Sequence, residues 1–143
     1  MASFNKFHSF AEYLAEKVVS LGADTLKVML TNTAPVAGNS IRANLTEIAA
    51  GNGYSAGGTI ATRVSSELDV VTDAYELILS SVVFTASGGS IGPFRYAVLY
   101  DDTTTSPADV LIGWWDYGSS LTLVSGESVT VGFSAAFGVL SIQ

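Results

Sequence analysis

The sequence predicts a mainly β protein, an antiparallel β-sandwich with one N-terminal α-helix. From residue 24 onward, apolar and polar residues alternate in short runs separated by Gly, Ser and Asp, which is typical of antiparallel sandwiches and not of alternating βαβ units. The chain has 143 residues, the usual size of one domain. We therefore expect a single domain over 1–143, with the helix in 1–22 and the sandwich in 23–143.

An apolar stripe near the N-terminus predicts a helix over residues 3–21. Its members recur at alternating spacings of four and three residues, and they are Phe7, Ala11, Leu14, Val18 and Leu21. Ser3 is the expected N-cap, and Gly22 stands where a left-handed C-terminal cap is common. Because the stripe is wide and aromatic, the helix is expected to lie on an apolar surface.

The strands are expected where the period switches to two. In the first of them, Leu26, Val28 and Leu30 alternate with more polar positions. Residues 32–58 are mostly loop, with one helical turn around 41–48. Further runs cover 59–65, 75–85, 94–101, 110–115, 121–124, 128–134 and 137–142. The residues Ser125-Gly126-Glu127 between two of these runs predict a short hairpin turn.

The 75–85 run changes parity halfway. Tyr75, Leu77 and Leu79 have one parity, whereas Val82 and Phe84 have the other. One extra residue at Ser80-Ser81 would bring all five onto the same face, so a bulge or bend is expected there.

Charge and composition exclude several partners. Six Lys and Arg stand against 13 Asp and Glu, for a net charge of -7, and there is no cysteine. Nucleic acid and anionic membranes need local positive charge, so we expect neither as a partner, and disulfides are excluded. The sequence shows no membrane span or signal peptide. Only 13% of residues are charged, against about a quarter in ordinary domains, which is typical of a surface that a partner covers.

Nothing in the sequence predicts an enzyme, a cofactor or a metal. His8 is the only histidine and no nucleophile or orienting group is marked beside it. The glycines of 51–58 do not have the spacing of a dinucleotide fingerprint. Asp101, Asp102 and Asp109 carry oxygen ligands but match no calcium loop, so a solvated connection is the favoured interpretation.

The Trp114-Trp115 pair lies in a strand whose two faces are both apolar. Adjacent strand residues point to opposite faces. By parity, Val110 and Ile112 share a face with Trp114, and Leu111 shares the other face with Trp115. The strand is therefore covered on both sides within the domain, or one face meets another chain.

Three segments are candidates for a partner interface. Trp115 and Tyr117 form the first, for which core packing and stacking on a sugar stay open as alternatives. The second is the N-terminal segment, whose alternative role is packing of the helix on the sandwich. The third is the glycine-rich loop 51–58, which is expected to order on docking. The residues singled out are Phe4, Phe7, Phe10, Gly53, Tyr54, Trp115 and Tyr117.

Two long stretches resemble known proteins. Residues 1–37, MASFNKFHSFAEYLAEKVVSLGADTLKVMLTNTAPVA, resemble the start of small structural proteins encoded in the head-gene region of tailed bacteriophages. Residues 94–142 resemble such proteins too, including capsid cement (decoration) proteins. The shared pattern is an aromatic-rich strand, an Asp-Asp/Thr turn, a Gly-Trp-Trp-Asp-Tyr-Gly strand end and a Gly-Glu hairpin. No residue-level binding site is transferred by this resemblance.

The resemblance implies a structural role on a virus particle. Such a protein is made in the bacterial host cytoplasm, docks on the capsid exterior and bridges neighbouring subunits of the major capsid protein. It also binds itself as a dimer or trimer, and a jelly-roll-like sandwich is the implied fold. The alternatives are a tail or head–tail connector component and a carbohydrate-binding module. The cement role needs no catalytic group.

Overall fold

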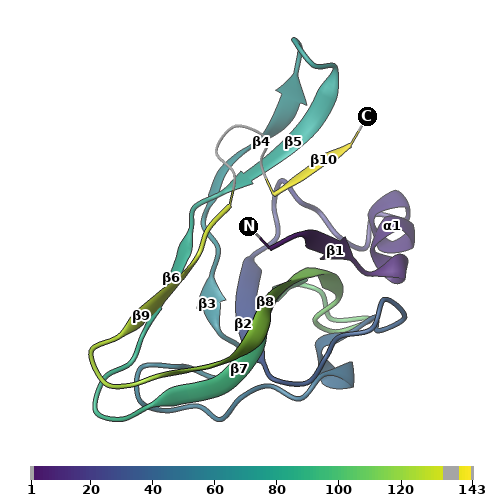
Figure 1. The fold of residues 1–143 in the computed structure, drawn as a ribbon. Helices are drawn as coiled ribbons and strands as arrows, with labels where there is room; N and C mark the ends of the chain where they lie inside the picture. Colours follow the sequence, from purple (N-terminus) through teal and green to yellow (C-terminus); the bar gives the residue numbers. More distant parts are fainter. Residues whose placement is uncertain (1, 134–138, 143) are drawn as a thin grey trace.

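The computed structural model describes residues 2–133 and 139–142 (Figure 1). Strands make up 49% of the described residues and helix 8%, and the strands pair in antiparallel sheets. The expectation of a mainly β, antiparallel sandwich with one helix is confirmed. The predicted runs at 128–134 and 137–142 extend in part beyond the described residues.

The elements follow one another along the chain, with the longest connections between α1 and β3. Their bounds are β1 (Phe4–Lys6), α1 (His8–Ala15), β2 (Leu26–Thr31), the 3₁₀ turn η1 (Arg42–Asn44), β3 (Thr59–Ile60), β4 (Arg63–Asp69), β5 (Ala74–Leu79), β6 (Val82–Thr85), β7 (Ile91–Asp101), β8 (Leu111–Leu123), β9 (Ser128–Val131) and β10 (Leu140–Ile142).

The strands form two layers (Figure 1). One layer is a five-stranded sheet in the order β1-β8-β7-β2-β3, and the other consists of a three-stranded sheet, β10-β5-β4, and the ribbon β6-β9. A jelly roll has eight strands in two sheets, whereas the ten strands of the described residues form three hydrogen-bonded sheets, so the jelly-roll part of the expectation is not reproduced.

The bend predicted at Ser80-Ser81 is present. The predicted strand divides there into β5, which pairs with β4 and β10, and β6, which pairs with β9. Leu77, Leu79, Val82 and Phe84 are all buried. The break therefore keeps the apolar side chains of both halves in the core while the chain changes direction.

The hairpin predicted at Ser125-Gly126-Glu127 is wrong, although a turn is present. The Glu127 amide donates to the Val124 carbonyl at 2.9 Å, but β8 pairs with β7 and β9 pairs with β6. The turn lies beside the connection from β6 to β7, where the Ala86 amide donates to the Glu127 carbonyl at 2.9 Å. The β6–β7 and β8–β9 connections therefore pass side by side from one layer to the other.

The N-terminal helix is shorter than predicted. Phe4–Lys6 form β1 on the edge of the five-stranded sheet, where Phe4 is opposite Trp115. The helix covers only His8–Ala15, so its cap positions are Phe7 and Glu16 and not Ser3 and Gly22. As a strand, Phe4–Lys6 gain backbone hydrogen bonds to β8. In the first turn of a helix, the N–H groups of these residues would have no partner within the helix. No helix in residues 2–133 and 139–142 has the length and apolarity that crossing a membrane requires.

Other boundaries shift because strands run on or divide. The predicted runs at 110–115 and 121–124 belong to one strand, β8. The run at 59–65 divides into β3 and the longer β4. The helical turn expected around 41–48 is the three-residue η1.

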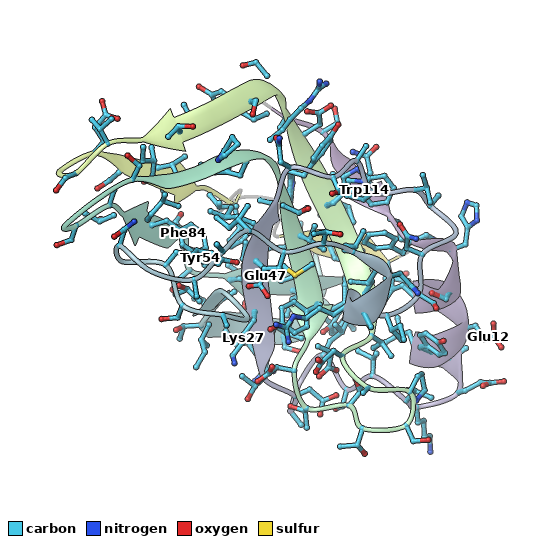
Figure 2. All side chains as sticks on the ribbon, turned by 90° about the horizontal axis from the view of Figure 1, so that it is seen from below. Glu12, Lys27, Glu47, Tyr54, Phe84 and Trp114 are labelled. Carbon is cyan, nitrogen blue, oxygen red and sulfur yellow. The ribbon has the colours of Figure 1, made fainter. Side chains whose placement is uncertain are left out.

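Apolar side chains cover both faces of the five-stranded sheet. The face toward the second layer carries the larger core cluster, which includes Leu30, Leu77, Phe84 and Leu99. The opposite face carries a smaller cluster, composed of Phe7, Met29, Val98, Tyr100 and Leu111. Figure 2 shows Trp114 on this sheet and Phe84 in the second layer.

Candidate functional site

Three of the residues expected at an interface lie inside the fold. Phe7, Phe10 and Tyr54 are 0%, 2% and 3% exposed. The ring of Phe7 packs 4.5 Å from the ring of Trp114, and Phe10 belongs to the larger core cluster. The folded chain does not offer these side chains to a partner, which corrects the expectation for them.

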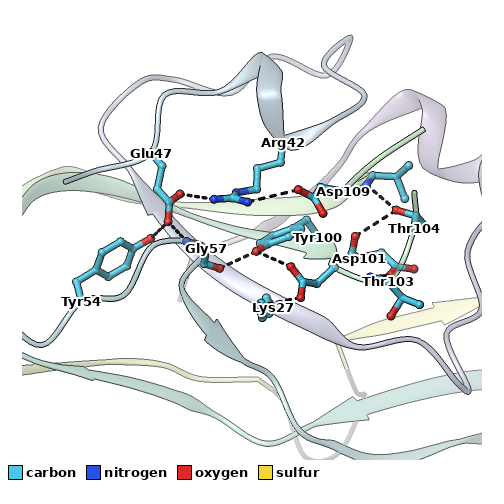
Figure 3. A network of polar contacts seen from close by, with 12 residues as sticks. Lys27, Arg42, Glu47, Tyr54, Gly57, Tyr100, Asp101, Thr103, Thr104 and Asp109 are labelled. Atoms are coloured by element: carbon cyan, nitrogen blue, oxygen red, sulfur yellow. Dashed lines mark hydrogen bonds and ion pairs between the residues drawn. The ribbon is translucent and has the colours of Figure 1, made fainter. Parts of the chain in front are cut away.

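The loop that carries Gly53 and Tyr54 is fixed by a polar network centred on Glu47 (Figure 3). One carboxylate oxygen of Glu47 accepts from the Tyr54 hydroxyl and from the Gly57 amide, both at 2.6 Å. The other accepts from Arg42 at 2.7 Å. Burial raises the pKa of the Tyr54 phenol well above its usual range, and the hydrogen bond to Glu47 raises it further, so the hydroxyl stays a donor.

The network continues to β7 and to the connection between β7 and β8. Arg42 reaches Asp109 at 3.4 Å and lies 5.4 Å from the centroid of the Tyr100 ring. The Tyr100 hydroxyl donates to the Gly57 carbonyl at 2.7 Å. The loop is thus anchored in the isolated chain, and the expectation that it orders on docking is not supported.

The two tryptophans point to opposite faces, but not with the partners that parity predicted. Leu99 is opposite Gly113 and Tyr100 is opposite Leu111, so Ile112 is an extra residue in β8. This bulge reverses the parity: Trp114 joins Leu111 in the smaller cluster, whereas Trp115 packs against the larger one.

Trp115 forms the wall of an apolar groove between the two layers. Its ring lies 5.2 Å from the ring of Phe4 and 5.3 Å from that of Phe133. The groove has a volume of about 360 Å³. We call it the inter-layer groove, and its lining is Ala2, Leu30, Phe94, Arg95, Tyr96, Ala97, Trp115, Tyr117, Val129, Thr130, Val131, Gly132 and Phe133.

Tyr117 stands at the inter-layer groove with 61% of its surface exposed. The neighbouring Asp116 holds Arg95 through two hydrogen bonds of 2.7 and 2.8 Å, which lowers the pKa of the Asp116 carboxyl. The structure therefore brings Phe4, Trp115 and Tyr117 together around one apolar surface, and Gly53 lies elsewhere, beside Thr85.

A second apolar surface, missed by the sequence patterns, is the tip of the β4–β5 hairpin. Val70 and Val71 are 82% and 89% exposed, and the hairpin projects beyond the rest of the fold (Figure 1). Asp69 closes the turn by accepting from the Val71 amide and the Thr72 hydroxyl, both at 2.9 Å. We call Val70 and Val71 the hairpin tip. The sequence pattern that could have revealed it is an apolar pair between Asp69 and Asp73.

The described residues contain no cluster of three or more His, Cys, Asp or Glu side chains able to hold a metal ion. His8 is exposed at the first position of α1. No protein-family model, curated protein or solved structure matches the chain.

Proposed function

We propose that this chain is a structural protein of a tailed-bacteriophage particle. Made in the bacterial host cytoplasm, it docks on the capsid exterior and joins neighbouring subunits of the major capsid protein, with further contacts to its own copies as a dimer or trimer. The resemblance of residues 1–37 and 94–142 to phage head-region proteins supports this role.

The observation that carries the proposal is the presence of two separate apolar surfaces on one small chain. The hairpin tip lies at the end of β4 and β5, whereas the inter-layer groove lies against β7, β8 and β9. These elements lie at different ends of the molecule (Figure 1). A protein that links neighbouring subunits needs at least two contact surfaces, because a protein with one surface binds a subunit without joining it to the next.

Bridging gains affinity from its geometry. Once one surface is bound, the second contact is intramolecular, and its effective concentration multiplies the overall affinity. A standard interface hides about 800 Å² per partner, but two smaller contacts suffice when both are held at once. Such a protein holds a shell together without chemistry.

Charge indicates what the hairpin contacts. Residues 64–94 contain no Lys or Arg, whereas the hairpin carries Glu67, Asp69, Asp73 and Glu76. Complementary potentials guide docking and exclude wrong partners. The partner is therefore expected to offer an apolar pocket surrounded by Lys or Arg.

A sugar fits the inter-layer groove less well than a protein does. Leu30, Val129 and Val131 line it, and aliphatic walls leave buried sugar hydroxyls without hydrogen-bond partners, which is costly. A glycan panel tests this alternative by tryptophan fluorescence. A saturable change that Trp115→Ala abolishes would favour a carbohydrate-binding module.

Copy number separates a cement protein from other virion roles. Gel densitometry of purified virions should give hundreds of copies per particle. A dozen copies or fewer would indicate a connector or tail component instead.

Rebinding to particles that lack the protein tests the two surfaces directly. We expect Val71→Ser and Tyr117→Ser each to lower occupancy at a fixed concentration at least about tenfold, the range of interface hot spots. Val36→Ser is the matched control, because Val36 is 59% exposed and lies outside both surfaces. Equal occupancy for all three variants would contradict the proposal.

A further inference from the structure

Strand β9 has a free edge that borders the inter-layer groove. Among the described residues, β9 pairs with β6 alone, in a two-stranded ribbon (Figure 1). Val129, Thr130 and Val131 all line the groove. Since adjacent strand residues point to opposite faces, a groove lined by three consecutive residues runs along the edge of β9 and not over one of its faces.

The register of the ribbon shows which backbone groups this edge presents. The Ala86 amide donates to the Glu127 carbonyl at 2.9 Å, so the ladder is hydrogen-bonded at this position. Hydrogen-bonded and non-hydrogen-bonded positions alternate along an antiparallel ladder. Val83 is opposite Thr130, three positions further along, so these two residues form a non-hydrogen-bonded pair. The N–H and C=O groups of Thr130 therefore point away from β6, to the free edge of β9.

A free edge of this kind can take up a further strand. Its unpaired N–H and C=O groups form a template for another chain, and a two-stranded ribbon gains stability from a third strand. Phe94 and Trp115 lie on the opposite wall of the groove. Side chains of an added strand that point toward this wall would therefore contact apolar and aromatic groups.

The groove favours an uncharged strand. Residues 128–133 carry no charged side chain. Among the described residues that line the groove, Arg95 alone is charged, and Asp116 holds it through two hydrogen bonds of 2.7 and 2.8 Å. A charged side chain in the groove would lose water without gaining a partner, which is costly.

A second copy of this chain is a poor occupant of the groove. The described strands of a copy already lie in sheets of their own, so the copy would have to bring its folded body between β9 and the layer that contains β7 and β8. A segment that is extended and unpaired before binding enters without this obstacle.

We propose that a capsid subunit contributes an extended, uncharged segment that pairs with the free edge of β9 and places its apolar side chains, at alternate positions, in the inter-layer groove. In strand addition, main-chain hydrogen bonds supply affinity and the contacts of alternate side chains supply specificity. This inference rests on the proposed function, because it names what the groove binds.

The experiment is rebinding of Thr130→Pro, in the full chain, to particles that lack the protein. Proline has no N–H and is tolerated on an edge strand where the N–H makes no bond within the sheet. The variant should therefore keep the fold, which circular dichroism checks. Its occupancy at a fixed concentration should fall at least about tenfold.

Val83→Pro is the matched control. The N–H of Val83 points to the opposite edge of the same ribbon, because Val83 and Thr130 form a non-hydrogen-bonded pair. This variant should bind like the wild type.

Hydrogen exchange on the wild-type chain, read by mass spectrometry, tests the same contact without a substitution. The Thr130 amide should exchange more slowly in the particle-bound chain than in the free chain, whereas the Val83 amide should not change. Equal exchange at Thr130 in the two states would overturn the inference, even if Thr130→Pro does not fold.

Two further results overturn the inference. If Tyr117→Ser lowers occupancy while folded Thr130→Pro and Val83→Pro both bind like the wild type, the groove docks a partner without strand addition, and the proposed function stands. If the purified wild type associates with itself in analytical ultracentrifugation and Thr130→Pro is monomeric, the occupant is a second copy. Wild-type occupancy for Tyr117→Ser and Val71→Ser as well would contradict the proposed function itself.

Discussion

Glu47 is the residue on which the arrangement of the loop 42–58 depends. Its carboxylate accepts from Arg42, from the Tyr54 hydroxyl and from the Gly57 amide. Figure 2 shows Glu47 within the fold, whereas Glu12 points away from the molecule on α1. Two residues of the same type therefore stand in opposite environments, and substitution should separate their roles.

Glu47→Ala should destabilise the protein by about 3 kcal/mol, because it leaves the Tyr54 hydroxyl and the Gly57 amide without this acceptor and leaves Arg42 with only its longer contact to Asp109. Urea unfolding followed by circular dichroism measures this free energy. Glu12→Ala is the control and should stay within about 0.5 kcal/mol of wild type. Equal effects of the two substitutions would show that the network around Glu47 does not hold the loop.

Gly58→Ala should destabilise the protein by about 3 kcal/mol. Gly58 has a φ of +75°, and an added Cβ would overlap the Val28 carbonyl oxygen and lie 2.7 Å from the Met29 Cα. Gly38→Ala is the control, since nothing lies within 4 Å of its added Cβ. The same unfolding measurement compares them, and a Gly58→Ala protein as stable as Gly38→Ala would contradict the close approach of this loop to β2.

At the residue scale, the sequence identifies the apolar side chains, but it does not reliably predict which of them lie at a surface and which lie in the core. Trp115 and Tyr117 were expected at one surface, and both line the inter-layer groove. Tyr54 was expected at an interface because it stands among glycines, but its hydroxyl pairs with a carboxylate seven positions away.

At the scale of elements, the β4–β5 hairpin combines exposed apolar residues with uncompensated charge. Glu67 is directly opposite Glu76 in the pairing of β4 with β5. Like charges in opposed positions destabilise a sheet. A hairpin that keeps both charges and an exposed apolar tip is suited to contact with a partner more than to stability alone.

Charge reversal in this pair should stabilise the chain. Glu67→Lys and Glu76→Lys should each raise the free energy of unfolding by about 0.5 kcal/mol, because each replaces repulsion with attraction across the strands. The double variant restores like charges and should lose the gain, which makes it the internal control. Denaturant unfolding at low salt measures all four proteins; additive gains in the double variant would contradict the cross-strand contact.

Elements were predictable where a pattern is local. The bend at Ser80-Ser81 follows from parity alone, because both halves must bury their apolar residues. The hairpin at 125–127 failed because a turn signal does not say which strands pair, and here β8 and β9 have other partners. The helix began too early because Phe4 suits a helical stripe and an edge strand equally well, and pairing with β8 decided between them.

At the scale of the whole molecule, both faces of the five-stranded sheet are covered within the chain. Among the large apolar residues that stay exposed in the described part of the chain, Val70 and Val71 form the hairpin tip and Tyr117 lines the inter-layer groove, whereas the others lie outside these two surfaces. The few charged residues and the net charge of -7 lead us to expect proteins as partners. That expectation comes from composition, and the fold adds the two surfaces at which we propose that partners bind.

Particles without this protein should be less robust. Removal of a bridging protein leaves the capsid subunits with fewer contacts against the packaged DNA, so DNA release on heating or osmotic shock should begin under milder conditions. Dye fluorescence on released DNA measures the onset, and adding back the wild-type chain should restore it. Identical release curves with and without the protein would argue against a stabilising role.

The most direct test of the central claim is a density map of the assembled particle in which this chain is traced. The account predicts that the hairpin tip and the inter-layer groove are both covered by other protein, one of them by a capsid subunit and the other by a neighbouring subunit or copy. A map in which Val70, Val71 and Tyr117 all face solvent would contradict it.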